Sequence, residues 1–325
     1  MPDLVPFAEI ERASRRLSGV ALRTPLVSFP MPGPADGPQL LVKAESLQPI
    51  GAFKLRGAYS AIAALPKEER ERGVVAHSSG NHAQAVAYTA RRLGIRAVLV
   101  VPHTTPKVKV QACIAHGAEV VFVEPTMEDR IATAEKLAAA HGLALIPPFD
   151  DPRIIAGQGT IGREIVDDRP DTEVVLVPIS GGGLIAGIAT AVKILDPSIK
   201  VIGVEPELAA DARASFRAGE PVSWRPEDTR RTIADALVAQ RVGDLTFAHI
   251  REYVDDIVTV SEDEIRDAMR RLALSARLIA EPGGAVATAA FLSRRDDLPA
   301  ARTYVSVLSG GNVDPALLQE VLSGG

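Results

Sequence analysis

The sequence predicts an α/β protein built from two open, twisted sheet units covered by helices. From residue 73 onward, short apolar runs rich in β-branched residues alternate with longer helical patterns. This rhythm is typical of parallel sheets covered on both faces. It stops at Pro147-Pro148-Phe149-Asp150-Asp151-Pro152, the clearest linker signal in the chain, and then starts again. A length of 325 residues also fits two domains of ordinary size.

The first unit alternates strands and helices between residues 73 and 147. The run Val74-Val75-Ala76 is predicted to be a strand that leads through Ser78-Ser79-Gly80-Asn81 into a helix ending near Arg92. Further strands are expected at 96–101, 119–123 and 143–146, and helices at 106–116 and 127–140.

The second unit follows the linker. Helices are predicted at 155–166, 184–194 and 262–278, and strands at 174–177, 200–204 and 304–308. We expect residues 1–47 to join this unit, an assignment that periodicity alone does not dictate. The expected division is a small α/β domain at 48–147 and a large α/β domain formed by 1–47 and 148–325.

Composition excludes several classes of function. The net charge is −5 with the two signs interspersed, which leaves no broad basic face for nucleic acid. No apolar run approaches the ~20 residues that cross a bilayer, and the N-terminus lacks a secretion signal. The single cysteine, Cys113, excludes an internal disulfide and any cysteine-rich metal cluster. We therefore expect a cytoplasmic protein without nucleic-acid or membrane partners.

Lys54 is the first candidate for chemistry. It follows the turn Pro49-Ile50-Gly51-Ala52-Phe53 at the predicted start of an amphipathic helix. The positive end of a helix, together with burial, lowers the pKa of a lysine amine, as an imine-forming lysine requires. Taken alone, the position fits a surface lysine at a helix end better.

Two segments join a strand to a helix, where free backbone N–H groups attract anions. Ser78-Ser79-Gly80-Asn81-His82 suits a carboxylate, although an ordinary N-cap fits it equally well. Ser180-Gly181-Gly182-Gly183-Leu184 suits a phosphate, because three glycines allow a close backbone approach. It is not a nucleotide P-loop, since no Gly-Lys-Ser/Thr follows.

Two further glycine-containing segments need interpretation. Gly157-Gln158-Gly159-Thr160-Ile161-Gly162 matches the dinucleotide pattern G-x-G-x-x-G, but it follows no strand and lacks the later ribose-binding acid. We interpret this match as coincidental. Ser309-Gly310-Gly311-Asn312 ends the last strand, where ligands sit in open α/β sheets, although a tight turn also fits.

Together these segments resemble the fold-type II pyridoxal-phosphate enzymes, specifically the serine/threonine dehydratase and serine racemase family. The resemblance runs from Arg23-Thr24-Pro25-Leu26 to Ser309-Gly310-Gly311-Asn312-Val313-Asp314 and includes Ile155-Ala156-Gly157-Gln158-Gly159-Thr160. It implies a fold like that of the tryptophan synthase β chain, with pyridoxal 5′-phosphate held between the two domains. It also implies a homodimer.

The resemblance implies roles for individual residues. Lys54 is similar to the lysine that carries the cofactor, Phe53 would pack on the ring, and Asn81 and Ser309 would bond its phenolic oxygen and its nitrogen. Ser79 is similar to the opposite-face acid/base of the racemases. The phosphate would lie on Ser180, Gly181, Gly182, Gly183 and Leu184. The substrate carboxylate would lie at Ser78, Ser79, Asn81 and His82.

The resemblance also implies a reaction and a metal. Lys54 would remove the α-proton while the cofactor delocalises the charge, hydroxide would leave from Cβ, and a keto acid and ammonia would follow. The family's divalent-cation loop aligns with Glu205, Ala209 and Asp211, whose oxygen ligands suit Mg²⁺, Ca²⁺ or Mn²⁺. A solvated acidic turn is the alternative for that loop.

The expected function is a lyase of amino-acid metabolism that acts on L-threonine or L-serine. A serine racemase with dehydratase side activity and a threo-3-hydroxyaspartate dehydratase are the alternatives on the same residues. Ser180 and Ala236 stand where glycine is common in the family, which leaves substrate preference open. Because the chain stops soon after Asn312, we expect no C-terminal regulatory domain and no feedback by isoleucine.

Overall fold

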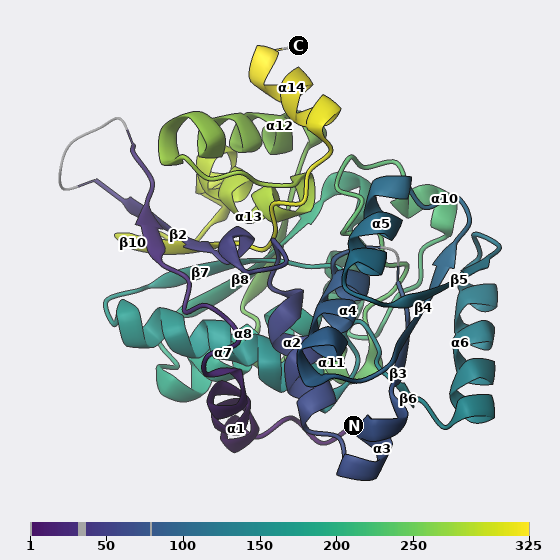
Figure 1. Cartoon of the computed structure of the whole chain (residues 1–325). Helices are drawn as coiled ribbons and strands as arrows, with labels where there is room; N and C mark the ends of the chain where they lie inside the picture. Colours follow the sequence, from purple (N-terminus) through teal and green to yellow (C-terminus); the bar gives the residue numbers. More distant parts are fainter. Residues whose placement is uncertain (1, 32–36, 79, 325) are drawn as a thin grey trace.

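The computed structural model describes residues 2–31, 37–78 and 80–324 and confirms the predicted α/β class (Figure 1). Within these residues the named strands form two sheets, one of six strands and one of four. Helices cover both faces of each sheet, and the inner strands β4, β7 and β10 are buried along their whole length.

The six-stranded sheet has the order β1-β2-β10-β7-β8-β9, and its neighbours are parallel except for the pair β1 and β2. The C-terminal strand β10 lies between the N-terminal strand β2 and β7, with Leu308 opposite Ala44. The segments that follow β2 and β10 therefore leave the sheet at the same edge. The strands are β1 Leu26–Ser28, β2 Gln39–Ala44, β7 Val174–Pro178, β8 Lys200–Pro206, β9 Asp256–Val260 and β10 Thr303–Leu308.

Two apolar cores hold helices on this sheet. One face packs against α12 and α13, and the opposite face packs against α7, α8 and α11, which lie above and below the sheet in Figure 1. Alternate residues of β7 supply both cores, because neighbouring side chains of a strand point to opposite faces. The helices are α7 Pro152–Asp168, α8 Gly183–Leu195, α11 Asp244–Tyr253, α12 Glu262–Arg271 and α13 Pro282–Ser293.

The four-stranded sheet is parallel and has the order β5-β4-β3-β6. Helices α2, α4 and α5 cover one face and α6 covers the other. Its strands are β3 Val74–His77, β4 Ala97–Pro102, β5 Glu119–Val123 and β6 Ala144–Leu145. Its helices are α2 Lys54–Ala63, α4 Asn81–Leu93, α5 Lys107–Ala115 and α6 Met127–His141.

Shorter helices complete the chain. The N-terminal helix packs on α7, and α14 packs on α12. These elements are α1 Phe7–Leu17, α3 Lys67–Arg72, α9 Asp211–Ala218, α10 Pro226–Thr229, α14 Pro315–Ser323 and the 3₁₀ turns Glu45–Leu47, Glu207–Ala209 and Arg295–Asp297. None of the helices in the described part of the chain is long and apolar enough to cross a membrane.

Several elements were not predicted, or end elsewhere. The predicted helix 262–278 stops at Arg271 and continues as a π-helical turn, Leu272–Ala276. Helix α13 carries almost no amphipathic signal because apolar and small residues occupy all of its own faces. Strands β2 and β9 pair with strands from distant parts of the sequence, and β1 has only three residues, so the pattern did not reveal them.

The G-x-G-x-x-G match lies in the middle of α7 and is a packing feature. A methyl group added at Gly157 would meet the carbonyl oxygen of Arg56 on α2 at 2.6 Å. At Gly162 it would meet the carbonyl oxygen of Ile188 on α8, also at 2.6 Å. The glycines therefore allow the backbones of α2 and α8 to approach α7, which agrees with the coincidental interpretation of the motif.

We predict that Gly162→Ala destabilises the protein. Alanine is favoured over glycine in a helix by about 1 kcal/mol, whereas overpacking costs about 1–3 kcal/mol and here meets backbone that cannot rotate away. A net loss of about 1 kcal/mol or more should appear in denaturant unfolding. Asp167→Ala, on the exposed end of α7, is the control and should change stability little. A stabilised Gly162→Ala protein would contradict the packing argument.

Candidate active site

Lys54 opens α2 with its amine turned inward. Its Nζ donates a hydrogen bond to the carbonyl oxygen of Pro148 at 2.7 Å and lies 5.2 Å from the ring centre of Phe53. Burial lowers the pKa of the Lys54 amine from 10.5 to about 8. A substantial part of the population is therefore the neutral amine near pH 8, the form that can act as a nucleophile or base.

The glycine loop 180–184 lies beside the chain segment that Lys54 contacts. The loop follows β7 and opens α8, and Gly182 has φ +92°, which favours glycine. A methyl group added at Gly181 would lie 2.3 Å from the ring of Phe149, the neighbour of Pro148. Pro148 accepts a hydrogen bond from Lys54, and Phe149 packs on the loop. The amine and the loop therefore both contact the segment 148–149.

The first turn of α8 presents free backbone donors. The N–H groups at a helix start have no acceptor within the helix. Among the described residues, no hydrogen bond occupies the N–H groups of Gly181, Gly182, Gly183 or Leu184. The side chain of Ser180 turns elsewhere, since its Oγ accepts from the N–H of Ala239 at 3.2 Å. The loop therefore offers four backbone donors and the positive end of a helix to an anion.

Ser309 lies at the start of the segment that closes the site from the other side. Its carbonyl accepts from the N–H of Phe53 at 3.0 Å, and its side chain is buried. An isolated bridge joins Ala52 to Gly310, and Gly311 N–H donates to Gly51 at 2.8 Å. These bonds hold the turn before Lys54 against the end of β10.

Asn81 joins the same group of residues through its side chain. Its Oδ1 accepts from Asn312 Nδ2 at 2.8 Å, and its Nδ2 donates to Glu281 Oε1 at 2.7 Å. A carboxamide nitrogen carries two hydrogens, so one N–H of Asn81 remains available to a ligand oxygen. Asn312 also donates to the carbonyl of Ile50, which ties Asn81 to the turn before Lys54.

His82 is buried, and the hydrogen bond of its Nε2 defines its protonation state. Nε2 lies 3.0 Å from the carbonyl oxygen of Ile146, which can only accept, so Nε2 carries the hydrogen. Burial, with a smaller effect of the Lys54 charge, lowers the pKa of His82 to about 3. Its neutral Nδ1 is a buried acceptor without a hydrogen-bond partner among the described residues. The ring therefore cannot donate a hydrogen bond to a carboxylate. The backbone N–H at the start of α4 can.

Ser78 follows β3, and its Oγ accepts from the N–H of Gly80 at 3.4 Å. Ser79 lies outside the described residues.

Glu281 is a buried acid that the motif analysis missed. It stands at the N-cap of α13 and bonds Asn81, from which it is separated by 200 residues in the chain. Burial raises its pKa to about 7, and nearby Asp235 adds to that effect. The sequence signal was an acid directly before Pro282-Gly283, a common way to begin a helix.

An ion pair joins the two sheet units near Glu281. Lys109 on α5 donates to Asp235 Oδ2 at 2.7 Å, and Asp235 belongs to the irregular segment after α10. The adjacent Ala236 lies next to Gly283, where an added methyl group would be 3.3 Å from the Ala236 side chain. The segment with Asp235 and Ala236 therefore lies between α5 and the start of α13.

The predicted metal residues lie on β8 and at the start of α9. Glu205 is fully buried and accepts from the N–H groups of Ala212 and Arg213 at 3.1 and 2.8 Å. Burial and the neighbouring Asp211 raise the pKa of Glu205, and burial raises the pKa of Asp211 to about 7. Within the described residues, no cluster of three or more His, Cys, Asp or Glu side chains is poised for a metal.

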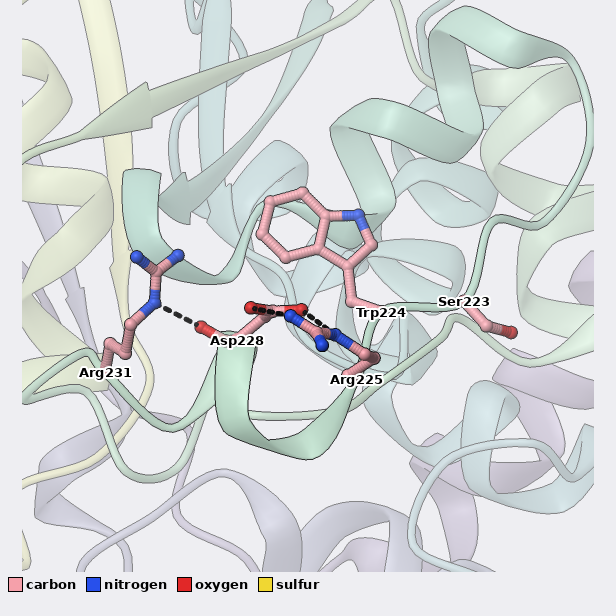
Figure 2. A pocket seen from close by; sticks show the side chains of 5 residues that line it. All are labelled: Ser223, Trp224, Arg225, Asp228 and Arg231. Carbon is pink, nitrogen blue, oxygen red and sulfur yellow. Dashed lines mark hydrogen bonds and ion pairs between the residues drawn. The ribbon is translucent and has the colours of Figure 1, made fainter.

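A separate hollow on the surface contains none of the predicted site residues (Figure 2). Its volume is about 420 Å³, and its lining includes Trp224, Arg225 and Arg231. Arg225 pairs with Asp228 at 2.8 Å, and Arg231 donates to the backbone carbonyl of Asp228.

The residues around Lys54 fit a phosphorylated aromatic aldehyde. The loop 180–184 supplies free donors for a phosphate, the Lys54 amine can form an imine, and Asn81 has a spare N–H for a ring oxygen. The neutral hydroxyl of Ser309 suits a ring nitrogen. At the adjoining edges of the two sheets, these residues would therefore suit an anion, an aldehyde carbon and a ring together.

Comparisons with known proteins agree with this fit. Residues 17–310 match the family model described as pyridoxal-phosphate dependent enzyme. The catabolic L-threonine dehydratase of Escherichia coli K12 is 42% identical over 318 residues, covering 98% of this chain and 96% of that protein. The L-threo-3-hydroxyaspartate ammonia-lyase of Saccharomyces cerevisiae is 40% identical over 322 residues, covering 99% and 98%. The structure of maize serine racemase superposes with a TM-score of 0.92 at 36% identity, covering 99% of this chain and 98% of the other.

We predict that Glu281→Gln reduces the dependence of stability on pH. The folded protein keeps the Glu281 proton up to a pKa of about 7, whereas the ordinary pKa is 4.5. Wild-type stability should therefore fall as pH rises through this window, and a glutamine cannot contribute to that fall. Between pH 5 and pH 8 the melting temperature of the variant should gain on wild type by about 2 °C or more.

Calorimetry on the cofactor-free protein would measure this difference. Glu320→Gln, at an exposed position, is the control and should follow the wild-type profile. Identical pH profiles for Glu281→Gln and wild type would show that Glu281 ionises normally.

Proposed function

The chain belongs to the pyridoxal-phosphate-dependent enzyme family, and from this premise we propose that it is a lyase acting on L-threonine or L-serine. It would eliminate water from the substrate, and the released enamine would then be hydrolysed to a 2-oxo acid and ammonia. One observation carries the proposal: the Lys54 amine bonds Pro148, while the next residue, Phe149, packs on the glycine loop. An amine of lowered pKa thus lies beside an anion-binding helix start.

We assign the covalent attachment and the proton transfer to Lys54. With a pKa of about 8, its amine is partly neutral at physiological pH, so it can bond an aldehyde carbon and later accept the α-proton of a substrate. Pro148 directs Nζ through the 2.7 Å hydrogen bond. Phe53, the N-cap residue of α2, supplies an aromatic face beside the amine.

We assign cofactor binding to the residues that surround Lys54. Pyridoxal phosphate, when bound, supplies an electron sink for the charge left on the α-carbon. The backbone N–H groups of the loop 180–184 would hold its phosphate, and Asn81 would donate its spare N–H to the ring oxygen. The Ser309 hydroxyl would accept or donate at the ring nitrogen without supplying a charge.

We assign substrate binding to the start of α4. Ser78, Ser79, Asn81 and the backbone N–H of His82 would hold the substrate carboxylate, because the free N–H groups of a first helical turn favour an anion. The His82 ring is excluded from that role by its neutral Nδ1, which can only accept. Ser79 is also our candidate for an acid/base on the opposite face, a role that racemisation would need.

The relatives keep two other reactions open on the same residues. A serine racemase would need a second proton donor opposite Lys54, and a hydroxyaspartate lyase would need recognition of a second carboxylate. The proposed lyase needs neither, and the catabolic threonine dehydratase of E. coli is similar over nearly the whole chain. We therefore place threonine and serine first.

We further propose the domain division 48–147 and 1–47 with 148–325, and a cytoplasmic homodimer. The two sheets support the division, since all four strands of one lie within 74–145. Leu47, Leu274 and Ile279 are exposed aliphatic side chains, and the segments around Ser46 and Ile279 both pack on Gly311. Such a surface suits contact with a second copy.

We propose that Glu205, Asp211 and the Ala209 carbonyl bind Mg²⁺, Ca²⁺ or Mn²⁺ with water. Asp211 Oδ2 is buried and has no hydrogen-bond partner among the described residues. Two buried carboxylates with raised pKa values are costly without a cation, and hard oxygen donors suit these metals. Binding would favour the ionised form of both.

We predict that the purified protein with pyridoxal phosphate converts L-threonine to 2-oxobutanoate and L-serine to pyruvate, each with ammonia. Lys54→Ala should lower turnover by at least about 10³-fold, because it removes both the attachment point and the base. The same samples would be assayed for D-serine and, with L-threo-3-hydroxyaspartate, for oxaloacetate. D-serine formed faster than pyruvate, or oxaloacetate formed much faster than 2-oxobutanoate, would replace the proposed substrate assignment.

We predict that added Mn²⁺, Mg²⁺ or Ca²⁺ raises the melting temperature and that a chelator reverses the rise. At about 100 times the dissociation constant, binding to the folded state adds about 2.7 kcal/mol. Asp211→Asn should abolish most of this response, whereas Asp167→Ala should retain it. An equal response in Asp211→Asn would show that the ion binds elsewhere.

A further inference from the structure

A buried cluster of charges lies directly behind Lys54. Arg56 is two residues further along α2, so its side chain leaves the helix in a different direction from that of Lys54. It is 1% exposed and lies between the carboxylates of Glu45 and Glu164. Lys43, fully buried on β2, pairs with the same Glu164 at 2.7 Å. We call these four residues the Arg56 cluster.

The guanidinium of Arg56 uses all of its nitrogens. Nε and Nη2 donate to the two oxygens of Glu45, both at 2.8 Å, while Nη1 and Nη2 donate to those of Glu164 at 2.6 and 2.9 Å. Thr160 accepts a further bond from Nη1 at 3.1 Å, and the Leu22 carbonyl accepts from Nη2 at 2.9 Å. Each carboxylate thus accepts two hydrogen bonds from Arg56. Two such bidentate pairs fix the orientation of the planar guanidinium, which single hydrogen bonds would not do.

The cluster connects parts of the chain that approach from different directions. Glu45 follows β2 and Glu164 lies on α7, both beside the six-stranded sheet, whereas α2 also packs against α4 of the four-stranded sheet. Arg56 is the member of the cluster that α2 contributes. The first turn of α2 is thereby tied to the unit that also carries the glycine loop and Ser309.

Energetics favour a role beyond general stability. Burying ions costs several kcal/mol each, and a buried ion pair often stabilises a fold no more than apolar residues would. The two positive and two negative charges of the Arg56 cluster balance, and its hydrogen bonds are fully used. Such a cluster adds little net stability. It fixes the geometry of the segments that it joins.

We propose that Arg56 is a positioning residue that fixes the first turn of α2 and so holds the Lys54 amine in its buried place beside the glycine loop. The proposal rests on the proposed function only for the assignment of Lys54 to the cofactor. It extends the functional set to Glu45, Glu164 and Lys43, none of which touches the reacting groups.

The pKa of the Lys54 amine depends on this geometry and can be measured. The lowering of its pKa has one cause, burial, and no carboxylate contributes to it. The titratable neighbour is His82, which stays neutral above a pKa of about 3. Any fraying of the first turn of α2 would let water reach Nζ and return its pKa toward 10.5.

The test compares three full-length variants with wild type. Arg56→Lys keeps a positive charge but loses both bidentate pairs. Lys43→Met with Glu164→Gln removes one charge of each sign, so Arg56 retains Glu45 but loses its charged tie to α7. His249→Gln is the control, because it disturbs a different buried hydrogen-bond group that joins Val5, Thr190 and His249.

Two measurements are made on each variant. The first is the pKa of Lys54 in the cofactor-stripped chain, from the pH dependence of its labelling by an amine-reactive reagent, read by peptide mass spectrometry. The second is the dissociation constant of pyridoxal phosphate, from its visible absorption on the protein. Melting temperatures show how far each variant is destabilised.

Arg56→Lys and the double variant should raise the Lys54 pKa by about one unit, which lowers the neutral fraction at pH 7 about tenfold. They should weaken cofactor binding about tenfold or more. His249→Gln should lower the melting temperature and leave both quantities at wild-type values.

The proposal is overturned if the folded variants keep the wild-type Lys54 pKa and cofactor affinity, or if His249→Gln shifts them equally. If Arg56→Lys fails to fold, the charge-balanced double variant decides. The labelling uses no substrate, so wild-type protein without lyase activity would reject the proposed reaction while leaving this result unaffected.

Discussion

The pairing of β2 with β10 is the constraint on which the rest of the structure depends. It places a strand from the start of the chain beside one from its end, with Ala44 opposite Leu308. Glu45 and Ser309, the next residues of each strand, consequently leave the sheet at one edge. The turn before Lys54 then bonds back to residues 309–312, so the Lys54 amine, Ser309 and the Arg56 cluster all derive their positions from this one pairing.

Close backbone contacts of α7 with α2 and α8 position the glycine loop relative to Lys54. Helix α7 carries glycines where α2 and α8 cross it, and each crossing leaves less room than a methyl group needs. Helix α2 begins with Lys54, and the glycine loop 180–184 leads into α8, so α7 sets the spacing between the amine and that loop. The same helix supplies Glu164 to the Arg56 cluster. A motif that looks like a nucleotide fingerprint is thus part of the packing that holds α2 and α8 against α7.

Burial is the common cause of the unusual ionisation around the site. It lowers the pKa of Lys54 and His82 and raises that of Glu281, Glu205 and Asp211. For Lys54 the result is a reactive amine near neutral pH, and for His82 a neutral ring committed to the Ile146 carbonyl. Arg56 is the contrast: it is equally buried, yet two carboxylates keep it charged. Lys54 can therefore exchange a proton, whereas the nearby Arg56 stays charged and holds the surrounding segments in place.

The sequence by itself determined the α/β class and the positions of the strand-to-helix loops, because periodicity, glycines and caps are local signals. The glycine loop 180–184 stood out for that reason, whereas Lys54 and Ser309 became candidates only through the resemblance of the combined segments to a known family. Only the tertiary structure decided which segments meet. The Asn81–Glu281 bond spans 200 residues and the Arg56–Glu164 pair spans 108, and no local pattern encodes such partners. Strand β2 and helix α13, which is buried on every side, escaped prediction because their identity lies in distant neighbours and not in their own residues. Strand β1, with three residues, is too short to show an alternation.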